Sequence, residues 1–252
     1  MGHPAPGLYR ELTTGFMTWV KICGMTNLED ALVAVEAGAD AVGFVFYEKS
    51  PRCVSVEAAR EIVDKLPERV ESVGVFAGES LRRAGEVGAW VGLDSLQVYP
   101  LPGPKRLEGL ENVGLRPAMQ RKPGQRKIYL ALPISNLVIE DVGETGLAVN
   151  VADPDSKFVA LLLDSGGGQQ PGGTGVAFDW NQAAPMVAGL SLLQKVVIAG
   201  GLTPQNVGQA MGILQPWGVD VATGVEARPG KKDAEKVRAF VRAVRDIDRK
   251  TH

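Results

Sequence analysis

The chain has 252 residues, of which 45% are apolar and 22% charged, and its formal net charge is −2. This balance allows a large core and excludes the basic field expected of a protein that binds nucleic acid or an anionic membrane surface. Two cysteines do not make a disulfide framework, and no apolar run approaches the ~20 residues that span a bilayer. We therefore expect an intracellular, cytoplasmic protein without a membrane partner.

Short apolar segments alternate with amphipathic ones along the first hundred residues. Residues 1–16 precede the ordered pattern and are expected to form a flexible tail. Asn27 is expected to cap a helix that Gly38 ends, and Ser55 precedes a second helix over 56–66. A third helix is expected over 80–87. The segments predicted to be strands are 20–23, 41–46, 72–76 and 96–98.

The middle of the chain is rich in proline and glycine from 99 to 127, where only a helix near 105–111 is suggested. Residues 133–157 hold no clear amphipathic helix, so we expect a long irregular connection there. A glycine-rich loop is predicted at 165–175. The remaining predicted strands are 128–132, 158–163, 196–199 and 219–222, and the remaining helices are 180–190, 204–214 and 234–249.

Continuously apolar strands that alternate with helices are typical of a parallel sheet covered by helices. Eight such units predict a (β/α)₈ TIM barrel in a single domain over 17–252, with an irregular region around strands four to six. A doubly wound open sheet is the alternative. No linker separates two balanced halves of the chain.

The loops that follow the strands of such a barrel share one face, and active sites lie there. An apolar run ends in Cys23, and another ends in Asp164. Arg52 lies in the loop after the second predicted strand, and Gln97 lies on the fourth. Glycine turns follow the last two strands. The residues expected on this rim are Cys23, Arg52, Gln97, Asp164, Gly200, Gly201, Thr223, Gly224, Val225 and Glu226.

Each of these residues also has a structural interpretation. A cysteine that ends a strand often fills space in a core, and an arginine in a loop is often solvated. Asp164 is harder to explain structurally, because a carboxylate that ends an apolar strand needs a partner or a site. The two histidines, His3 and His252, lie at the ends of the chain, so proton transfer would use other groups. The run 231–233, Lys-Lys-Asp, is expected to be a solvated surface.

With these residues assembled, the chain resembles the phosphoribosylanthranilate isomerase family of tryptophan biosynthesis. The matching stretches extend from one end of the predicted domain to the other. They are KICGMTNLEDA (21–31), AGADAVGFVFYEKSPRCVS (37–55), VGVFAG (73–78), LLLDS (161–165), GGTGVAFDW (172–180), IAGGLTPQNV (198–207) and GVDVATGVEARPGKKD (218–233). Residues 99–157 match poorly.

The resemblance implies a (β/α)₈ barrel that performs an Amadori rearrangement of N-(5-phosphoribosyl)anthranilate without cofactor or metal. It implies that Cys23 is the general base, Asp164 the general acid and Arg52 the group that holds the anthranilate carboxylate. The phosphate of this phosphosugar would bind at Gly200, Gly201, Gly224 and their neighbours, at the other end of the sugar from Arg52. The acid must keep its proton near neutral pH, and we expect cationic groups or a helix N-terminus to lower the pKa of the Cys23 thiol.

Three stretches depart from the family pattern. The usual Gln-Leu-His-Gly reads Gln97-Val98-Tyr99-Pro100 here, so a tyrosine replaces the histidine. The usual Ser-Ser-Gly-Val-Glu begins with Ala222-Thr223, which we expect to be tolerated. The loop after Asp164 has extra glycines and is expected to be mobile. Cys53 is expected to be a passive replacement, and a Cys23–Cys53 disulfide is not expected in a reducing compartment.

Two other functions remain open. One is a related barrel isomerase that acts on a histidine-pathway aminoaldose and uses aspartates at the ends of strands one and five. The first predicted strand ends in Cys23 and the fifth shows no aspartate, which argues against it. The other is a non-catalytic barrel that binds a phosphosugar. The presence of both Cys23 and Asp164 argues against a mere binder.

Overall fold

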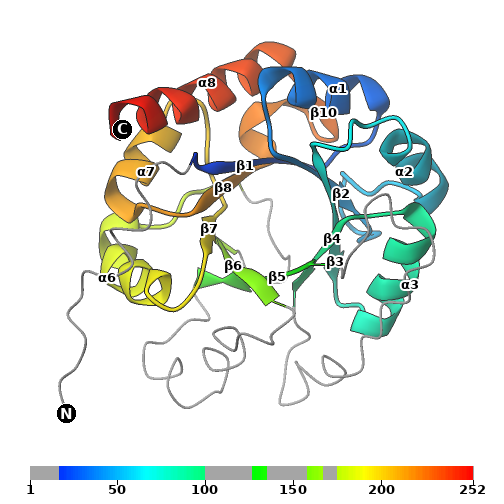
Figure 1. The fold of residues 1–252 in the computed structure, drawn as a ribbon, viewed down its shortest axis with the longest axis horizontal. Helices are drawn as coiled ribbons and strands as arrows, with labels where there is room; N and C mark the ends of the chain where they lie inside the picture. Colours follow the sequence, from blue (N-terminus) through cyan, green and yellow to red (C-terminus); the bar gives the residue numbers. More distant parts are fainter. Residues whose placement is uncertain (1–16, 100–126, 135–157, 167–174, 252) are drawn as a thin grey trace.

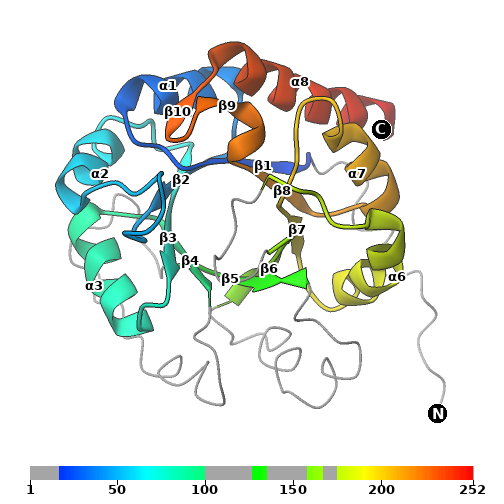
Figure 2. The same ribbon diagram turned by 180° about the vertical axis from the view of Figure 1, so that it is seen from behind.

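The chain forms a closed barrel of eight parallel strands surrounded by helices, as seen from both ends in Figures 1 and 2. The structure is a computed structural model and describes residues 17–99, 127–134, 158–166 and 175–251. The strands follow one another around the barrel in chain order, and β1 pairs with β8 to close it. The predicted TIM barrel is therefore confirmed, and the open sheet is excluded.

The strands and helices alternate as the sequence pattern predicted. The strands are β1 (Trp19–Cys23), β2 (Ala41–Val45), β3 (Glu71–Ala77), β4 (Ser95–Tyr99), β5 (Lys127–Pro133), β6 (Phe158–Asp164), β7 (Val196–Ile198) and β8 (Gly218–Val221). The helices are α1 (Leu28–Ala37), α2 (Val56–Val63), α3 (Leu81–Val91), α6 (Trp180–Ser191), α7 (Val207–Leu214) and α8 (Ala234–Thr251). A short 3₁₀ helix, η2 (Thr223–Val225), and a hairpin of β9 (Glu226–Arg228) and β10 (Lys231–Lys232) follow β8.

Side-chain caps start the first three helices. The side chain of Asn27 accepts the main-chain N–H of Asp30, and Ser55 and Ser80 cap α2 and α3 in the same way. Each cap satisfies one of the N–H groups that a helix leaves without an internal partner. Helix α1 ends at Gly38, as predicted, whereas α2 is three residues shorter and α3 four residues longer at the C-terminal end than the pattern indicated.

The strands are buried on both faces, which explains why they read as continuous apolar runs. One set of side chains, including Phe44 and Leu96, packs between the strands and the surrounding helices. The alternate set, including Val73 and Leu162, fills the inside of the barrel. A polar side chain at one of these alternate strand positions therefore points into the barrel interior rather than toward a helix.

Aromatic rings close the end of the barrel where the strands begin. Trp19 stacks on Tyr129 and on Trp217, with ring centroids 5.3 Å and 5.4 Å apart. The Tyr129 hydroxyl donates to the buried carboxylate of Glu71 at 3.0 Å. This packing fills that end of the barrel interior with side chains.

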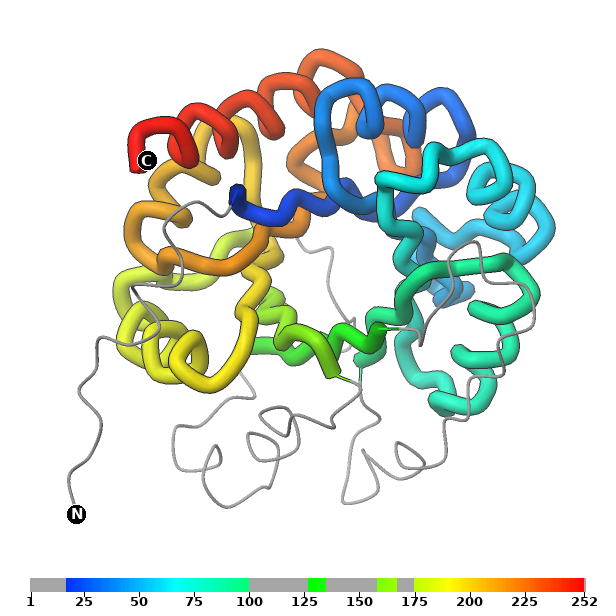
Figure 3. The backbone as a smooth tube through the Cα atoms, viewed as in Figure 1, coloured from blue at the N-terminus to red at the C-terminus, as the bar shows by residue number. Residues whose placement is uncertain are grey.

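Helix α8 ties the last part of the chain to the first. It packs against α1 and α7, and the end of the chain lies beside its ordered beginning in Figure 3. Arg245 donates to the main-chain oxygen of Thr18 and pairs with Asp40 at 2.7 Å and with Asp248 at 3.3 Å. The closed barrel is thus held by side chains from both ends of the domain.

Several predictions fall outside the described residues: the tail over 1–16, the helix near 105–111, most of the irregular connection at 133–157 and most of the glycine-rich loop after Asp164. The boundary of the domain at 17 stays a prediction. Among the helices that the structure describes, none combines the length and the apolar character needed to cross a bilayer.

Candidate active site

A cavity of about 750 Å³, counting the space that opens to solvent, lies where the strands end. Cys23 of β1 and Asp164 of β6 both line it. The other expected site residues that line it are Arg52, Gln97, Gly200, Gly201, Thr223 and Gly224.

A buried lysine lies beside the predicted base. Residues alternate along β1, so Lys21 and Cys23 point into the barrel on the same side. The Lys21 ammonium is fully buried and contacts Asp220 Oδ2 and Gln97 Oε1, each at 2.7 Å. Gly43 of β2 makes room for both side chains: a Cβ there would lie 2.7 Å from Cys23 Sγ and 2.9 Å from Lys21 Cε.

Burial determines the protonation of the Cys23 thiol in this structure. It raises the pKa of Cys23 above its ordinary value, although the Lys21 ammonium acts in the opposite direction. The expected lowering of the thiol pKa is therefore wrong, because desolvation outweighs the nearby cation. Burial also opposes the charge on Lys21, but Asp220 and Cys23 outweigh it and raise the pKa of Lys21, which stays an ammonium.

The predicted acid is held by hydrogen bonds to both of its oxygens. Asp164 ends β6 and is 5% exposed. Its Oδ2 accepts the Tyr99 hydroxyl at 3.1 Å, and its Oδ1 accepts the main-chain N–H of Gly166 at 3.1 Å. The carboxyl group therefore has a defined orientation at the mouth of the barrel, where it borders the cavity.

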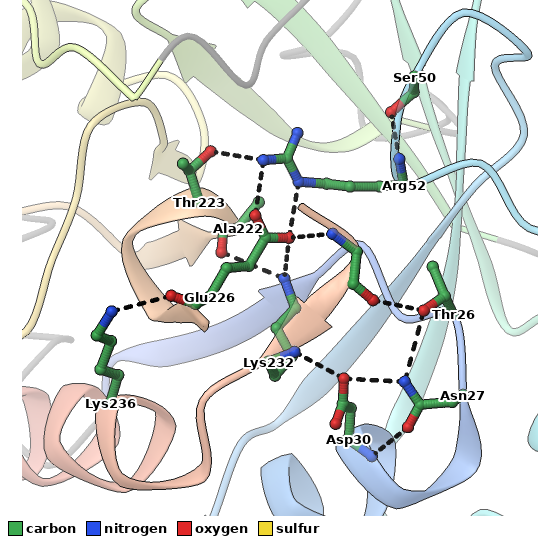
Figure 4. A network of polar contacts seen from close by, with 11 residues as sticks. Thr26, Asn27, Asp30, Ser50, Arg52, Ala222, Thr223, Glu226, Lys232 and Lys236 are labelled. Atoms are coloured by element: carbon green, nitrogen blue, oxygen red, sulfur yellow. Dashed lines mark hydrogen bonds and ion pairs between the residues drawn. The ribbon is translucent and has the colours of Figure 1, made fainter. Parts of the chain in front are cut away.

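Arg52 is buried and already paired with a carboxylate. Its Nε and Nη2 donate to the two oxygens of Glu226, each at 2.8 Å (Figure 4). Lys232 also pairs with Glu226, at 3.1 Å. Burial alone would raise the pKa of Glu226, but Arg52 and Lys232 outweigh it and hold that pKa below its ordinary value. Glu226 is therefore ionised, and its carboxylate holds the Arg52 guanidinium in place.

One prediction needs correction here. The run 231–233 is not a solvated surface throughout: Lys231–Lys232 forms β10, and Lys232 is 4% exposed, with its ammonium paired to Glu226. The contacts of Val225 and Glu226 with substrate stay predictions, although neither residue lines the cavity. Val225 is fully buried in the core, and the Glu226 carboxylate is turned toward Arg52 and Lys232.

The two expected anion-binding groups are neighbours. Nη2 of Arg52 donates to Thr223 Oγ1 at 3.0 Å, so the guanidinium adjoins the loop after β8 instead of lying across the mouth from it. Among the residues that the structure describes, Nη1 of Arg52 has no hydrogen-bond partner. The two N–H groups of Nη1 thus remain for a ligand.

The main chain of the loop after β7 borders the cavity. Gly200 and Gly201 have φ values of +82° and +64°, a region that strongly favours glycine. A Cβ on Gly201 would overlap the main chain of Ala177. Without side chains, the backbone of this loop can approach an anion closely, as phosphate sites in barrels require.

Sequence reasoning missed Lys21, Asp220 and Lys232. The signal for the first two is their position: each is a charged residue within an otherwise apolar strand, and Lys21 lies two residues before Cys23, on the same face. No local pattern marks Lys232, whose partner Glu226 belongs to the preceding strand of a hairpin. Cys23 is buried and Cys53 exposed, and both are free.

The family model described as N-(5'phosphoribosyl)anthranilate (PRA) isomerase matches residues 20–111 and 130–243, which is most of the chain. The chain belongs to this family. The N-(5'-phosphoribosyl)anthranilate isomerase of Pseudomonas aeruginosa (strain LESB58) is 44% identical over 227 residues, with 90% of this chain and 94% of the relative covered. That of Pseudomonas paraeruginosa is 46% identical over 231 residues, with 91% and 96% covered.

Solved structures of the isomerase family agree with the fold. The phosphoribosyl anthranilate isomerase of Thermotoga maritima superimposes with a TM-score of 0.73 at 37% identity, covering 91% of this chain and all of the other. A family structure solved in complex with reduced 1-(o-carboxyphenylamino)-1-deoxyribulose 5-phosphate has a TM-score of 0.70 at 36% identity, covering the same share of this chain and all of its own.

Proposed function

We propose that this chain catalyses the Amadori rearrangement of N-(5'-phosphoribosyl)anthranilate to 1-(o-carboxyphenylamino)-1-deoxyribulose 5-phosphate, a step of tryptophan biosynthesis. The observation that carries the proposal is that a thiol and a carboxyl group, Cys23 and Asp164, line one cavity together with an arginine and two glycine loops. Membership of the isomerase family supports the same reaction.

Asp164 acts first, as the general acid. It gives its proton to the ring oxygen of the ribose while the bond from that oxygen to C1 breaks. The bonding electron pair stays on the oxygen, which becomes the C4 hydroxyl. The nitrogen lone pair forms a C1=N bond, so the open-chain intermediate is a protonated Schiff base, and Asp164 is left as a carboxylate.

Cys23 acts second, as the general base. Its thiolate takes the proton from C2, and the electron pair of that C–H bond moves toward the cationic C1=N group. The product is an enolamine, which becomes the ketone when C1 gains a proton and the C2 hydroxyl loses one. The enzyme ends with a thiol and a carboxylate, and one proton must pass from Cys23 to Asp164, directly or through solvent, before the next turnover.

Arg52 and the glycine loops orient the substrate. In this proposal Nη1 of Arg52 donates to the anthranilate carboxylate, while Glu226 and Lys232 hold the guanidinium in position. The phosphate is assigned to the loops of Gly200, Gly201 and Gly224, where main-chain N–H groups are the donors. Fixing both anions of one substrate restricts the positions that its sugar carbons can take beside Asp164 and Cys23.

The test follows the fluorescence of freshly prepared phosphoribosylanthranilate as purified protein consumes it. Cys23→Ser and Asp164→Asn should each lower kcat by at least about tenfold, since general acid–base groups contribute roughly 10²–10⁴-fold each. Cys53→Ser, which changes the exposed cysteine in the same way, is the matched control and should leave kcat unchanged. An inert wild type, or full activity in both active-site variants, would refute the proposal.

The role of Arg52 has its own variant. Arg52→Ala should raise KM by about tenfold or more with a smaller change in kcat, because a charge-assisted hydrogen bond to the substrate is lost. An unchanged KM would exclude Arg52 as the carboxylate-binding group.

The histidine-pathway alternative finds no support in the described strands. Strand β5, Lys127–Pro133, contains no aspartate, and β1 ends in Cys23. A barrel that binds a phosphosugar without catalysis would give the inert result above. The same assay therefore distinguishes the isomerase from a non-catalytic binder.

A further inference from the structure

Tyr99 stands where the family resemblance leads one to expect a histidine, and its hydroxyl contacts the proposed acid. Strand β4 carries Gln97 and Tyr99 two residues apart, so both side chains point into the barrel. Gln97 is 2% exposed and Tyr99 is 9% exposed. The mechanism derived above uses neither side chain.

The hydrogen bond between Lys21 and Gln97 fixes which way the Gln97 amide points. A lysine ammonium has three donors and no acceptor. The atom of Gln97 that lies 2.7 Å from Lys21 Nζ must therefore be the carbonyl oxygen, Oε1. The amide nitrogen of Gln97 then points the other way, toward Tyr99.

The orientation of Gln97 in turn fixes the hydroxyl of Tyr99. Nε2 of Gln97 can only donate a hydrogen bond, and it lies 3.4 Å from the Tyr99 oxygen. The Tyr99 oxygen accepts there, so its own proton remains for the other neighbour, Oδ2 of Asp164, at 3.1 Å. Burial and the carboxylate of Asp164 raise the pKa of Tyr99 well above its ordinary value, so the hydroxyl keeps this proton.

We propose that Tyr99 is a positioning residue for the acid: the one-way chain of hydrogen bonds Lys21→Gln97→Tyr99→Asp164 aims the tyrosine hydroxyl at Oδ2 of Asp164 and stabilises the carboxylate that forms there. This inference rests on the proposed function of Asp164. Negative charge develops on Asp164 as its proton passes to the ring oxygen. A donor that is already aligned requires no reorganisation at that moment.

The charged and titratable groups around these hydrogen bonds come from strands β1, β6 and β8. Asp220 of β8 and Cys23 of β1 both act electrostatically on Tyr99, and Asp220 also interacts with Asp164. Lys21 of β1 lies between Asp220 and Gln97. A variant that changes only the Tyr99 hydroxyl leaves all of these charges in place, so its effect on Asp164 reports on this one donor.

The test measures the Asp164 carboxyl directly, by carbon NMR of protein with labelled aspartate, with Asp164→Asn to assign the signal. A hydrogen bond polarises the carboxylate that accepts it. In Tyr99→Phe the Asp164 carboxyl signal should therefore shift from its wild-type position at the same pH. Gln97→Leu should give a smaller shift in the same direction, because the hydroxyl is still present but no longer aimed.

The kinetic arm uses the same variants. Tyr99→Phe should lower kcat by about tenfold, on the order of the worth of one hydrogen bond to a charged group, and should change KM by less than about threefold. Tyr129→Phe is the matched control. It also removes one buried tyrosine hydroxyl that donates to a carboxylate, but at Glu71 near the opposite end of the barrel. It should leave both kcat and the carboxyl signal of Asp164 unchanged.

The outcomes separate this inference from the proposed function. If the Asp164 carboxyl signal has the same position in Tyr99→Phe and in the wild type, the positioning role is overturned. If the signal in Gln97→Leu has the wild-type position, the aiming by Gln97 is overturned. If the wild type does not isomerise the substrate, the proposed function fails, yet the NMR signal still decides whether Tyr99 positions Asp164.

Discussion

Nζ of Lys21 lies 2.7 Å from Oδ2 of Asp220 inside the barrel, and the two side chains are 0% and 8% exposed. The pair joins β1 to β8, the two strands that close the sheet. A buried ion pair of this kind is costly to break, because either charge left alone has no water to solvate it. It also keeps a cation beside the thiol of Cys23.

Lys21→Met should therefore lower the free energy of unfolding by about 3–5 kcal/mol, as expected when one partner of a buried ion pair is removed. Lys21→Met combined with Asp220→Leu should recover much of this loss, because an apolar pair is tolerated where a single charge is not. Urea unfolding followed by circular dichroism gives both values. Arg82→Met, which breaks an exposed pair with Glu86, is the control and should have little effect.

The alkylation of Cys23 should depend steeply on pH. Because burial raises the pKa of Cys23, the reactive thiolate is scarce at neutral pH and increases as the pH rises. In a Cys53→Ser background, the rate of reaction with iodoacetamide should still be rising at pH 9. A rate that is flat between pH 6 and 9 would mean that the thiol is already ionised.

Glu226→Gln tests the support of Arg52. The change leaves Arg52 and Lys232 buried beside each other without their shared anion, and should cost about 3 kcal/mol in the free energy of unfolding. The pKa of Glu226 is lowered in the folded protein, so its stabilisation is present above the unfolded pKa and is lost as the pH falls through the folded one. The difference between wild type and variant should thus shrink in acid.

The control for this variant is Glu86→Gln, which makes the same substitution at an exposed position of α3. Equal unfolding curves for Glu226→Gln and wild type at neutral pH would contradict the role assigned to Glu226. The KM of Glu226→Gln should also rise, because a less fixed Arg52 binds the substrate carboxylate less well.

Gly201→Ala tests the loop after β7. The added methyl group would meet the main chain of Ala177 at a positive φ, so the loop must shift away from its present path. We expect KM to rise by about tenfold or more, with the affinity for inorganic phosphate, measured by calorimetry, falling in parallel. Gly212→Ala, at a helical glycine with open space around it, is the control and should change neither value.

The sequence predicted the barrel well because each of its elements carries a local signal. Helix starts at Asn27, Ser55 and Ser80 follow from side chains that compete for the first N–H groups. Strand ends at Cys23 and Asp164 follow from where an apolar run stops. These signals depend on neighbouring residues, which a single sequence displays.

The contacts between polar side chains inside the barrel could not be predicted in the same way. Lys21 and Asp220 are 199 positions apart, and Tyr99 and Asp164 are 65 apart. Their contacts depend on the register of β1 with β8 and on the shared interior of the barrel. Arg52 was expected to bind a ligand, but two of its N–H groups donate to Glu226, which lies 174 positions away in the sequence. Such long-range pairs follow only from the closed sheet.

The pairing of β1 with β8 has a consequence for synthesis of the protein. While the ribosome is still making the second half of the chain, the edge of β1 that later meets Gly218–Val221 has no strand beside it. A nascent chain that stops at Trp217 should therefore aggregate through this strand edge. The fragment should bind more thioflavin T than the full chain does. The barrel can therefore close only after Gly218–Val221 has been made.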